Sequence, residues 1–322
     1  MRPTRRGLAA LLCATAGVAG AATPWPDRPV RLIIPGPPGG SSDIMARILA
    51  DEVARAIGQP MVIEPKPGVG GNLATDHVAR AQPDGYTLLF GDIGPLAINP
   101  ALFANLTYDP VRDFDPIAQV ALFPWIIVAH PSLPARTLEE VMALARRTPG
   151  GLAYATPGIG TPSHLTGAIL SEKTGGAFIH VPYRGGGPAT TDVLAGQVKL
   201  GILGLPPVAQ HLRSGALRGI AVSTAARSPT APEVPGMAES GLPGFDAAVW
   251  YGVLAPHGTG SEVIARMNAA LGRALADPAV RQRLQQQGVS PAFSSPEAFA
   301  ALIRAEITRW APVVRAAGAR IE

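Results

Sequence analysis

Short apolar runs alternate with longer amphipathic segments along most of the chain. Several runs are rich in branched residues and end at glycine, proline or aspartate, which is typical of short β-strands. Other segments repeat apolar positions at helical spacing. Strands that alternate with helices predict an α/β fold in which helices cover both faces of the sheets. We predict strands at 30–34, 61–63, 87–90, 126–129, 179–181, 200–203 and 220–222, and helices around 44–53, 138–145, 263–275 and 299–307.

Polar residues just before these helical patterns predict where the helices begin. Thr137 and Ser261 precede apolar-periodic segments and are expected to be N-caps. Ser295 is followed by Pro296, and this order suits a cap followed by the first helical residue. Asp43 is a candidate cap for the helix after the first strand.

The first 22 residues have the pattern of a secretory signal. Three arginines are followed by an apolar run at 8–18 and by small residues at 19–22. A membrane anchor is the alternative, but the run is shorter than the roughly 20 residues that a bilayer requires. The Arg5-Arg6 pair leaves the twin-arginine route open beside the general secretory route. We therefore predict cleavage after about residue 22 and a periplasmic protein.

Removal of this segment changes the composition that matters for function. The only cysteine, Cys13, leaves with it, so the mature chain has no disulfide or thiolate chemistry. The remaining 24 basic and 23 acidic residues give a net charge near +1. Basic patches with interleaved aromatics are absent from the sequence, which argues against a nucleic-acid partner.

Two proline-rich stretches, 108–119 and 228–244, enclose a central segment. This arrangement predicts one domain inserted into another, with two connections that suit a hinge-bending clamp. Lobe 1 would contain residues 23–122 and 246–322, and lobe 2 residues 123–245. The alternative is a single large α/β domain with a long surface loop.

The segment 35–43, PGPPGGSSD, joins a predicted strand to a predicted helix. Glycines there expose backbone amides, and a helix N-terminus adds unpaired N–H groups and a partial positive charge. Such a loop can bind an anion without any basic side chain. Nucleotide-binding glycine spacings are absent, and the alternative is a turn without a ligand. A second loop of this kind, 154–164, precedes a predicted helix at 165–172, so two loops are expected to face each other across a cleft.

The chain resembles the substrate-binding proteins of tripartite tricarboxylate transporters, the Bug or TctC-like family. The resemblance runs along almost the whole mature chain. It is carried by WPDRPVRLIIPGPPGGSSDIMARILADEVARAIGQP, EPKPGVGGNLATDHVARAQPDGYTLLFGD, GPLAINPALF, YDPVRDFDPIAQVA, HVPYRGGGPATTDVLAGQV, LRGIAVSTAARSP, WYGVLAPHGTG and WAPVVRAAGARIE.

This resemblance implies a type II periplasmic-binding-protein fold, with two lobes, each a mixed sheet flanked by helices, that close on a small carboxylate. It implies that loops of both lobes hold the carboxylate, and that Asp192 opens onto the cleft. It also implies membrane transporter components as partners; we expect a monomer. The ligand-binding residues expected on this basis are Pro35, Gly36, Pro37, Gly39, Gly40, Ser41, Asp43, Thr156, Pro157, Gly158, Gly160, Thr161, His164, Asp192 and Gly204.

Departures from the family pattern predict a less polar pocket. Gly36 replaces a bulky aromatic, and residues 156–159, TPGI, replace a more polar run. Gly204-Leu205-Pro206 also stands in place of polar residues, and Asp92-Ile93 in place of a polar pair. We therefore expect an aromatic or otherwise apolar monocarboxylate rather than citrate.

Other interpretations of the sequence are weaker. The loop 64–72 is interpreted as a structural turn near the cleft, and the four tryptophans as packing residues, with Trp125 and Trp250 near the lobe connections. The six histidines lack metal-ligand spacing, and the sequence has no catalytic triad or cofactor motif. We expect no metal, no cofactor and no enzymatic activity. A periplasmic sensor subunit and, less favoured, a secreted α/β enzyme remain the alternatives to a transport receptor.

Overall fold

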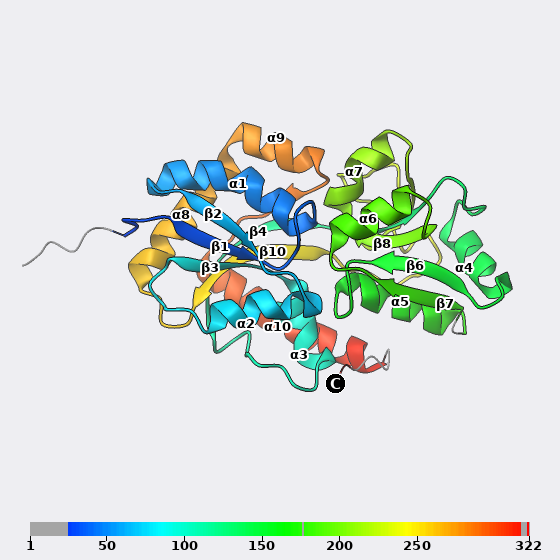
Figure 1. The fold of residues 1–322 in the computed structure, drawn as a ribbon, viewed down its shortest axis with the longest axis horizontal. Helices are drawn as coiled ribbons and strands as arrows, with labels where there is room; N and C mark the ends of the chain where they lie inside the picture. Colours follow the sequence, from blue (N-terminus) through cyan, green and yellow to red (C-terminus); the bar gives the residue numbers. More distant parts are fainter. Residues whose placement is uncertain (1–24, 176, 317–320, 322) are drawn as a thin grey trace, which may run out of the picture.

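The computed structural model describes residues 25–175, 177–316 and 321. Figure 1 shows two α/β lobes side by side, each with a central sheet and helices on both of its faces. The predicted signal segment, 1–22, lies outside the described residues. Within the described ranges, no helix combines the length and the apolar character needed to cross a bilayer.

The first lobe is built on a mixed sheet with the strand order β11-β4-β10-β3-β1-β2 among the described residues. Strand β1 pairs in parallel with β2 and β3, whereas β10 runs antiparallel between β3 and β4. The strands are β1 (Val30–Ile34), β2 (Met61–Pro65), β3 (Thr87–Asp92), β4 (Phe114–Phe123), β10 (Val249–Pro256) and β11 (Ser290–Pro291).

The second lobe has a mixed sheet with the order β7-β6-β8-β5-β9 among the described residues. Strands β7, β6 and β8 are parallel, and β5 runs antiparallel between β8 and β9. The strands are β5 (Trp125–Ala129), β6 (Leu152–Thr156), β7 (Phe178–Pro182), β8 (Leu200–Gly204) and β9 (Arg218–Val222). All five residues of β5 are buried, as expected for a central strand covered on both faces.

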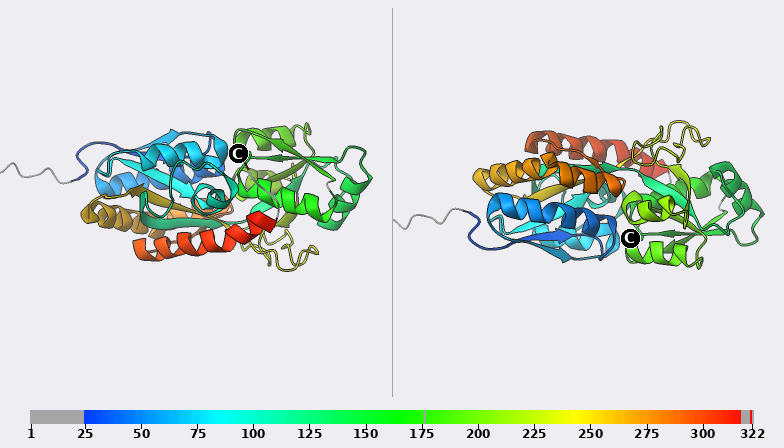
Figure 2. Two further views of the ribbon diagram at one scale, coloured as in Figure 1. Left: turned by 90° about the horizontal axis from the view of Figure 1, so that it is seen from below. Right: turned by 90° about the horizontal axis from the view of Figure 1, so that it is seen from above.

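Helices cover both sheets (Figure 2). In lobe 1, α1 packs with α8 and α9, and α10 packs with α3 and the turn η2. In lobe 2, α6 and α7 lie over one face and α5 over the other (Figure 1). The helical elements are α1 (Ser41–Ile57), η1 (Val69–Gly71), α2 (Asn72–Ala79), η2 (Gly94–Ile98), α3 (Asn99–Leu102), α4 (Leu138–Arg147), α5 (Pro162–Lys173), α6 (Gly186–Leu194), α7 (Leu205–Arg213), α8 (Ser261–Ala276), α9 (Pro278–Gln286) and α10 (Pro296–Ala316).

The structure confirms the predicted strands and two of the four predicted helix caps. Thr137 forms a capping box with Glu140, and Ser295 Oγ accepts from the Ala298 amide at 3.2 Å. Two cap predictions were wrong. Helix α8 begins at Ser261 itself, with Gly260 as its N-cap, and Gly40 rather than Asp43 is the N-cap of α1.

The chain crosses between the sheets at two adjacent points. Strand β4 ends at Phe123 and β5 begins at Trp125; the return path joins β9 to β10. Ser223 connects the crossings, because its amide donates to Trp125 O at 2.9 Å and its hydroxyl donates to Ala247 O at 2.6 Å. We therefore propose residues 23–122 with 246–322 and residues 123–245 as the two lobes.

The proline-rich stretch 108–119, predicted as part of a hinge, contributes to β4, and the first crossing between the sheets follows it at 123–125. Pro116 lies at a register shift between β4 and β10, where the missing amide donor is tolerated. The pairing with β10 thus overrides the loop-like composition.

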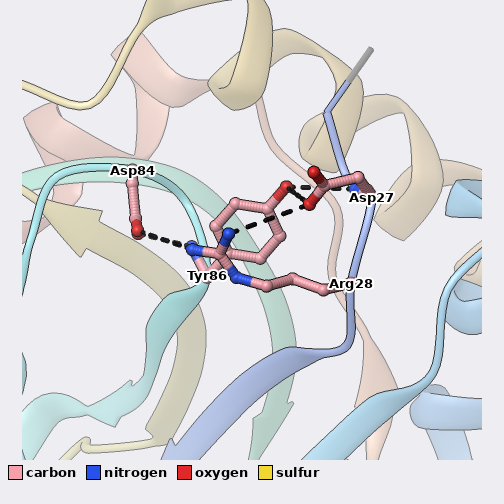
Figure 3. A network of polar contacts seen from close by, with 4 residues as sticks. All are labelled: Asp27, Arg28, Asp84 and Tyr86. Atoms are coloured by element: carbon pink, nitrogen blue, oxygen red, sulfur yellow. Dashed lines mark hydrogen bonds and ion pairs between the residues drawn. The ribbon is translucent and has the colours of Figure 1, made fainter. Parts of the chain in front are cut away.

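Exposed polar contacts hold the first described residues against lobe 1 (Figure 3). The Tyr86 hydroxyl donates to Asp27 Oδ1 at 2.7 Å, and Arg28 pairs with Asp84 at 3.2 Å. The Arg28 guanidinium lies 3.7 Å from the Tyr86 ring centroid. Each exposed pair contributes at most about 1 kcal/mol, but together they fix the path into β1.

Candidate functional site

A cavity of about 500 Å³ lies between the two lobes. Lobe 1 contributes the loop after β1, the loop before α2 and residues of β3, β4 and β10. Lobe 2 contributes the loops before α5, α6 and α7. This volume suits a small organic molecule, and the position between two hinged lobes is a common place for a ligand.

Among the described residues, five helices present their N-termini to this cavity. Each N-cap residue lines it: Gly40 of α1, Gly71 of α2, Thr161 of α5, Gly185 of α6 and Gly204 of α7. Aligned peptide dipoles make each N-terminus locally positive, and unpaired amides add to this effect except where prolines lack the N–H group, as at Pro162 of α5 and Pro206 and Pro207 of α7. Their convergence gives the cavity a strong preference for an anion without a cluster of basic side chains.

The first glycine-rich loop, residues 35–43, is held in shape by Asp43. This buried carboxylate accepts from the Gly39 amide at 3.0 Å and from Arg47 Nε at 2.8 Å. Gly39 and Asp43 therefore lie behind the lining and support it. The predicted residues of this loop that line the cavity are Pro35, Gly36, Pro37, Gly40 and Ser41.

The second loop, residues 156–164, has the same division between lining and support. Pro157, Gly158 and Thr161 line the cavity. Thr156, Gly160 and His164 are outside the lining. Thr161 Oγ1 caps α5 by accepting from the His164 amide at 3.3 Å.

Two stacked imidazoles support the second loop from behind. His164 and His180 stack with ring centroids 4.4 Å apart, and Tyr154 also stacks on His180, at 5.2 Å. His180 Nε2 lies 2.6 Å from Thr156 Oγ1, which accepts from the Gly158 amide at 3.2 Å. Burial, and secondarily the neighbouring His164, lowers the pKa of His180 to about 4. Burial also lowers the pKa of His164, so both rings are neutral at neutral pH.

Of the two remaining predicted residues, Gly204 lines the cavity and Asp192 does not. Gly204 lines the cavity where the lobes meet, and a methyl group placed on it would lie 2.4 Å from Ser41 Oγ. Asp192 is outside the lining and accepts from the Tyr183 hydroxyl at 2.7 Å. Tyr183 does line the cavity, so Asp192 orients a lining group.

Sequence reasoning missed several lining residues. The loop interpreted as a structural turn contributes Pro67 to Gly71, and the end of β7 with the segment after it contributes Pro182 to Gly186. The glycines just before α2 and α6 could have identified these two segments, since glycines before helices identified the first two loops. Trp125 lines the cavity, whereas Trp250 is buried against Phe299.

The wall between these loops is largely apolar and aromatic. Tyr251 forms its centre, because it stacks on Phe90 at 5.1 Å and on Phe123 at 5.8 Å. The lining members of this wall are Val69, Phe103, Phe123, Trp125, Ile159, Val249, Tyr251 and Ile321. Among the described lining residues, Asp92 is the only acid and Arg184 the only base.

Glycines let the lobes approach closely. A methyl group on Gly185 would lie 2.2 Å from Pro37 Cδ of the other lobe, and one on Gly70 would lie 2.9 Å from Ile159 O. Both glycines have positive φ, at 123° and 61°. The structure is therefore a closed arrangement in which backbone meets backbone across the cleft.

Comparisons with known proteins agree with this architecture. Residues 45–319 match the family model described as tripartite tricarboxylate transporter family receptor. Protein BugT of Bordetella pertussis is 38% identical over 315 residues, which cover 97% of each chain. The structure of the periplasmic binding protein BugD superposes with a TM-score of 0.88 at 35% identity, covering 92% of this chain and 100% of BugD. An R. palustris protein, Rpa4515, solved with adipate, gives a TM-score of 0.87 at 34% identity with the same coverage.

Proposed function

Because the chain belongs to the tripartite tricarboxylate transporter receptor family, we propose that it captures a small carboxylate with an apolar or aromatic body for such a transporter. Membership makes it a periplasmic solute-binding receptor with the two-lobed fold of that class. The observation that carries the proposal is the convergence of five helix N-termini on one cavity in the described residues.

The carboxylate would lie against the amides of the loops before α1 and α5. Charge-assisted hydrogen bonds from backbone amides to a carboxylate are stronger than neutral ones. Ser41 adds a hydroxyl group at the N-terminus of α1, whereas the Thr161 hydroxyl donates to Gly158 O at 2.7 Å and fixes the second loop. Burial of a ligand carboxylate is therefore compensated by donors that are already in place.

The body of the ligand would contact the aromatic wall around Tyr251 and Trp125. Apolar burial contributes about 25 cal/mol per Å², so an apolar chain or ring gains affinity that a third carboxylate would lose. The adipate complex of the R. palustris relative supports a carboxylate with an apolar middle. We propose that citrate binds more weakly than such acids.

The protein would act as a monomer that delivers its ligand to the membrane components of the transporter. The signal pattern at 1–22 supports export, with the general secretory route favoured over the twin-arginine route.

Thermal shift and calorimetry with a panel of carboxylic acids test this function. We expect adipate, hexanoate or 3-phenylpropanoate to raise Tm, since a ligand that binds only the native state stabilises it by mass action. Trp125 lines the cavity, so its fluorescence should change in the same titrations. Tight citrate binding without binding of the apolar acids would contradict the proposed ligand class.

Two matched threonine variants connect the binding to the helix ends. Thr161→Ala and Thr137→Ala each remove a side-chain N-cap, of α5 at the cleft and of α4 elsewhere. Both should lower stability by about 1 kcal/mol. Only Thr161→Ala should weaken carboxylate binding, by several-fold, and equal affinities in the two variants would argue against the role of α5.

A further inference from the structure

We propose that Val69 is a specificity-determining residue whose side chain contacts the apolar body of the ligand. This inference rests on the proposed function and identifies one residue that selects for the body of the ligand rather than for its carboxylate. It comes from an uncommon combination in the loop before α2, where a strained backbone carries an exposed apolar side chain at the cavity.

The backbone of Val69 is left-handed. Its φ of 49° makes it the only non-glycine residue with a positive φ in the described part of the chain. A β-branched side chain strongly disfavours this region, and turns with two consecutive positive φ values contain mainly glycine, asparagine and aspartate. Gly68 and Gly70 flank Val69, and glycine at position 69 would form the same turn without strain.

Hydrogen bonds hold the turn in this conformation. The Gly71 amide donates to Gly68 O at 3.0 Å and closes the turn. The Gly70 carbonyl oxygen accepts from Nδ2 of the buried Asn99 at 3.3 Å. Asn99 Nδ2 also donates to Asn72 Oδ1 at 2.6 Å, at the start of α2. The strained conformation persists because the surrounding structure fixes the turn at several points.

Packing within the protein does not account for the valine. The Val69 side chain is 52% exposed and lies outside the hydrophobic core. It lines the cavity between the lobes. A strained and exposed side chain without core contacts stabilises the free protein little, so we infer that its contribution comes from contact with what enters the cavity.

A second exposed apolar side chain borders the same part of the cavity from lobe 2. Ile159 is 47% exposed and lines the cavity. A methyl group on Gly70 would lie 2.9 Å from Ile159 O, so the backbones that carry Val69 and Ile159 meet across the cleft. A ligand body that covers these two side chains removes both from water, which favours an apolar body over a polar one.

The test compares an acid with a large apolar body and an acid with a small one. 3-Phenylpropanoate and butanoate are titrated into the wild type, Val69→Gly and Val69→Asn by calorimetry. Val69→Gly should bind 3-phenylpropanoate about fivefold more weakly, because it loses the apolar contact, and butanoate less than about twofold more weakly. Asparagine tolerates a positive φ and has a comparable size, so Val69→Asn should show the same selective loss through its polar amide alone.

Thermal unfolding without ligand tests the strain. Val69→Gly should preserve Tm or raise it by up to about 4 °C, because relief of the left-handed valine opposes the greater freedom of the unfolded chain. Val62→Gly is the matched control at a half-exposed valine of β2. It should lower Tm by about 2–4 °C and leave both affinities unchanged.

The outcomes separate the two proposals. Equal losses for the two acids would mean that Val69 shapes the loop instead of contacting the ligand body, and unchanged affinities would exclude the contact. A fall in Tm as large as that of Val62→Gly would mean that the valine carries no strain. Each of these results would overturn the role of Val69 and leave the carboxylate function intact. Failure of the wild type to bind either acid would overturn the proposed function, and this inference with it.

Discussion

The two glycine-rich loops place similar helix ends at the cavity but are supported in different ways. In lobe 1 the support is a charge: Asp43 accepts from the Gly39 amide and pairs with Arg47. In lobe 2 the support is neutral, a chain that runs from the Gly158 amide through Thr156 to His180 and the stacked His164. The same donor surface can thus be supported by a carboxylate paired with an arginine or by a stacked pair of histidines.

This difference predicts which change disrupts the ligand-binding loop of each lobe. The lobe 1 loop should depend on one side chain, because Asp43 alone connects it to α1 through its carboxylate. The lobe 2 loop should depend on the protonation of a histidine pair. Both loops should depend equally on closure, since each works only when the other lies across the cleft.

The largest expected effect removes closure and therefore disables both loops. In Gly185→Ala the new methyl group would lie 2.2 Å from Pro37 Cδ, so the lobes cannot approach as they do here. Overpacking of this kind costs roughly 1–3 kcal/mol, which predicts about a tenfold or greater loss of affinity by calorimetry. Small-angle scattering should show a more extended particle with ligand present.

Gly175→Ala is the matched control for closure. Gly175 also has positive φ, at 71°, but has open space around it. Gly175→Ala should lose about 1–2 kcal/mol of stability from its left-handed backbone, and Gly185→Ala up to about 3 kcal/mol, because φ 123° with ψ 171° is adopted almost only by glycine. If Gly175→Ala weakened binding as much as Gly185→Ala, the effect would be general destabilisation rather than blocked closure.

An intermediate effect is expected when the lobe 1 loop alone loses its support. Asp43→Ala leaves the Gly39 amide without its acceptor, which costs about 1–3 kcal/mol of stability and should reduce carboxylate affinity about tenfold. Asp76→Ala breaks a similar ion pair with Arg80 on α2 and should affect binding little. Asp43→Asn keeps an acceptor for Gly39, and loss of binding in that variant would show that the charge itself is required.

The smallest effect concerns the lobe 2 support and acid. The pKa of His180 is about 4 in the folded protein, against 6.5 as its ordinary value. The unfolded chain therefore binds more protons between these values, so this group lowers the stability of the native state as the pH falls from 6.5 to 4. His180→Gln lacks this term, so the Tm difference between wild type and variant should shift by a few degrees between pH 7.5 and pH 4.5.

His257→Gln, which removes an exposed imidazole paired with Asp115 outside the second loop, is the comparison variant for the acid experiment. An unchanged difference between wild type and His180→Gln across this pH range would mean that His180 does not carry the acid sensitivity of the loop.

Local sequence patterns, such as strand-bounding prolines and helix caps, predicted most of the fold because the tertiary structure keeps the secondary structure that these patterns favour. Strand β1 is bounded by Pro29 and Pro35, and Thr137 with Glu140 forms the capping box that the pattern favours. Strand β4 was missed because its prolines and aspartates are typical of a loop, and only pairing with β10 and β11 makes it a strand. That pairing joins segments more than a hundred residues apart.

The candidate site was predicted only in part, because local patterns reveal its loops but not the contacts between distant strands. Glycine loops before helices are local features, so nine of the fifteen expected residues line the cavity, and Asp43 and Thr156 support it from behind. The aromatic wall was missed because Tyr251 and Phe123 meet only through the antiparallel sheet.

The pair of crossings joined by Ser223 has a consequence for affinity. Two adjacent hydrogen-bonded connections keep the glycine-rich loops of the two lobes close together. A ligand bound to one loop therefore meets the other loop at an effective concentration on the order of millimolar or higher. A ligand that first touches one loop then meets the second in an intramolecular step. Two loops that each bind an anion weakly can therefore bind it tightly together. The chain needs no cluster of arginines to retain an anion.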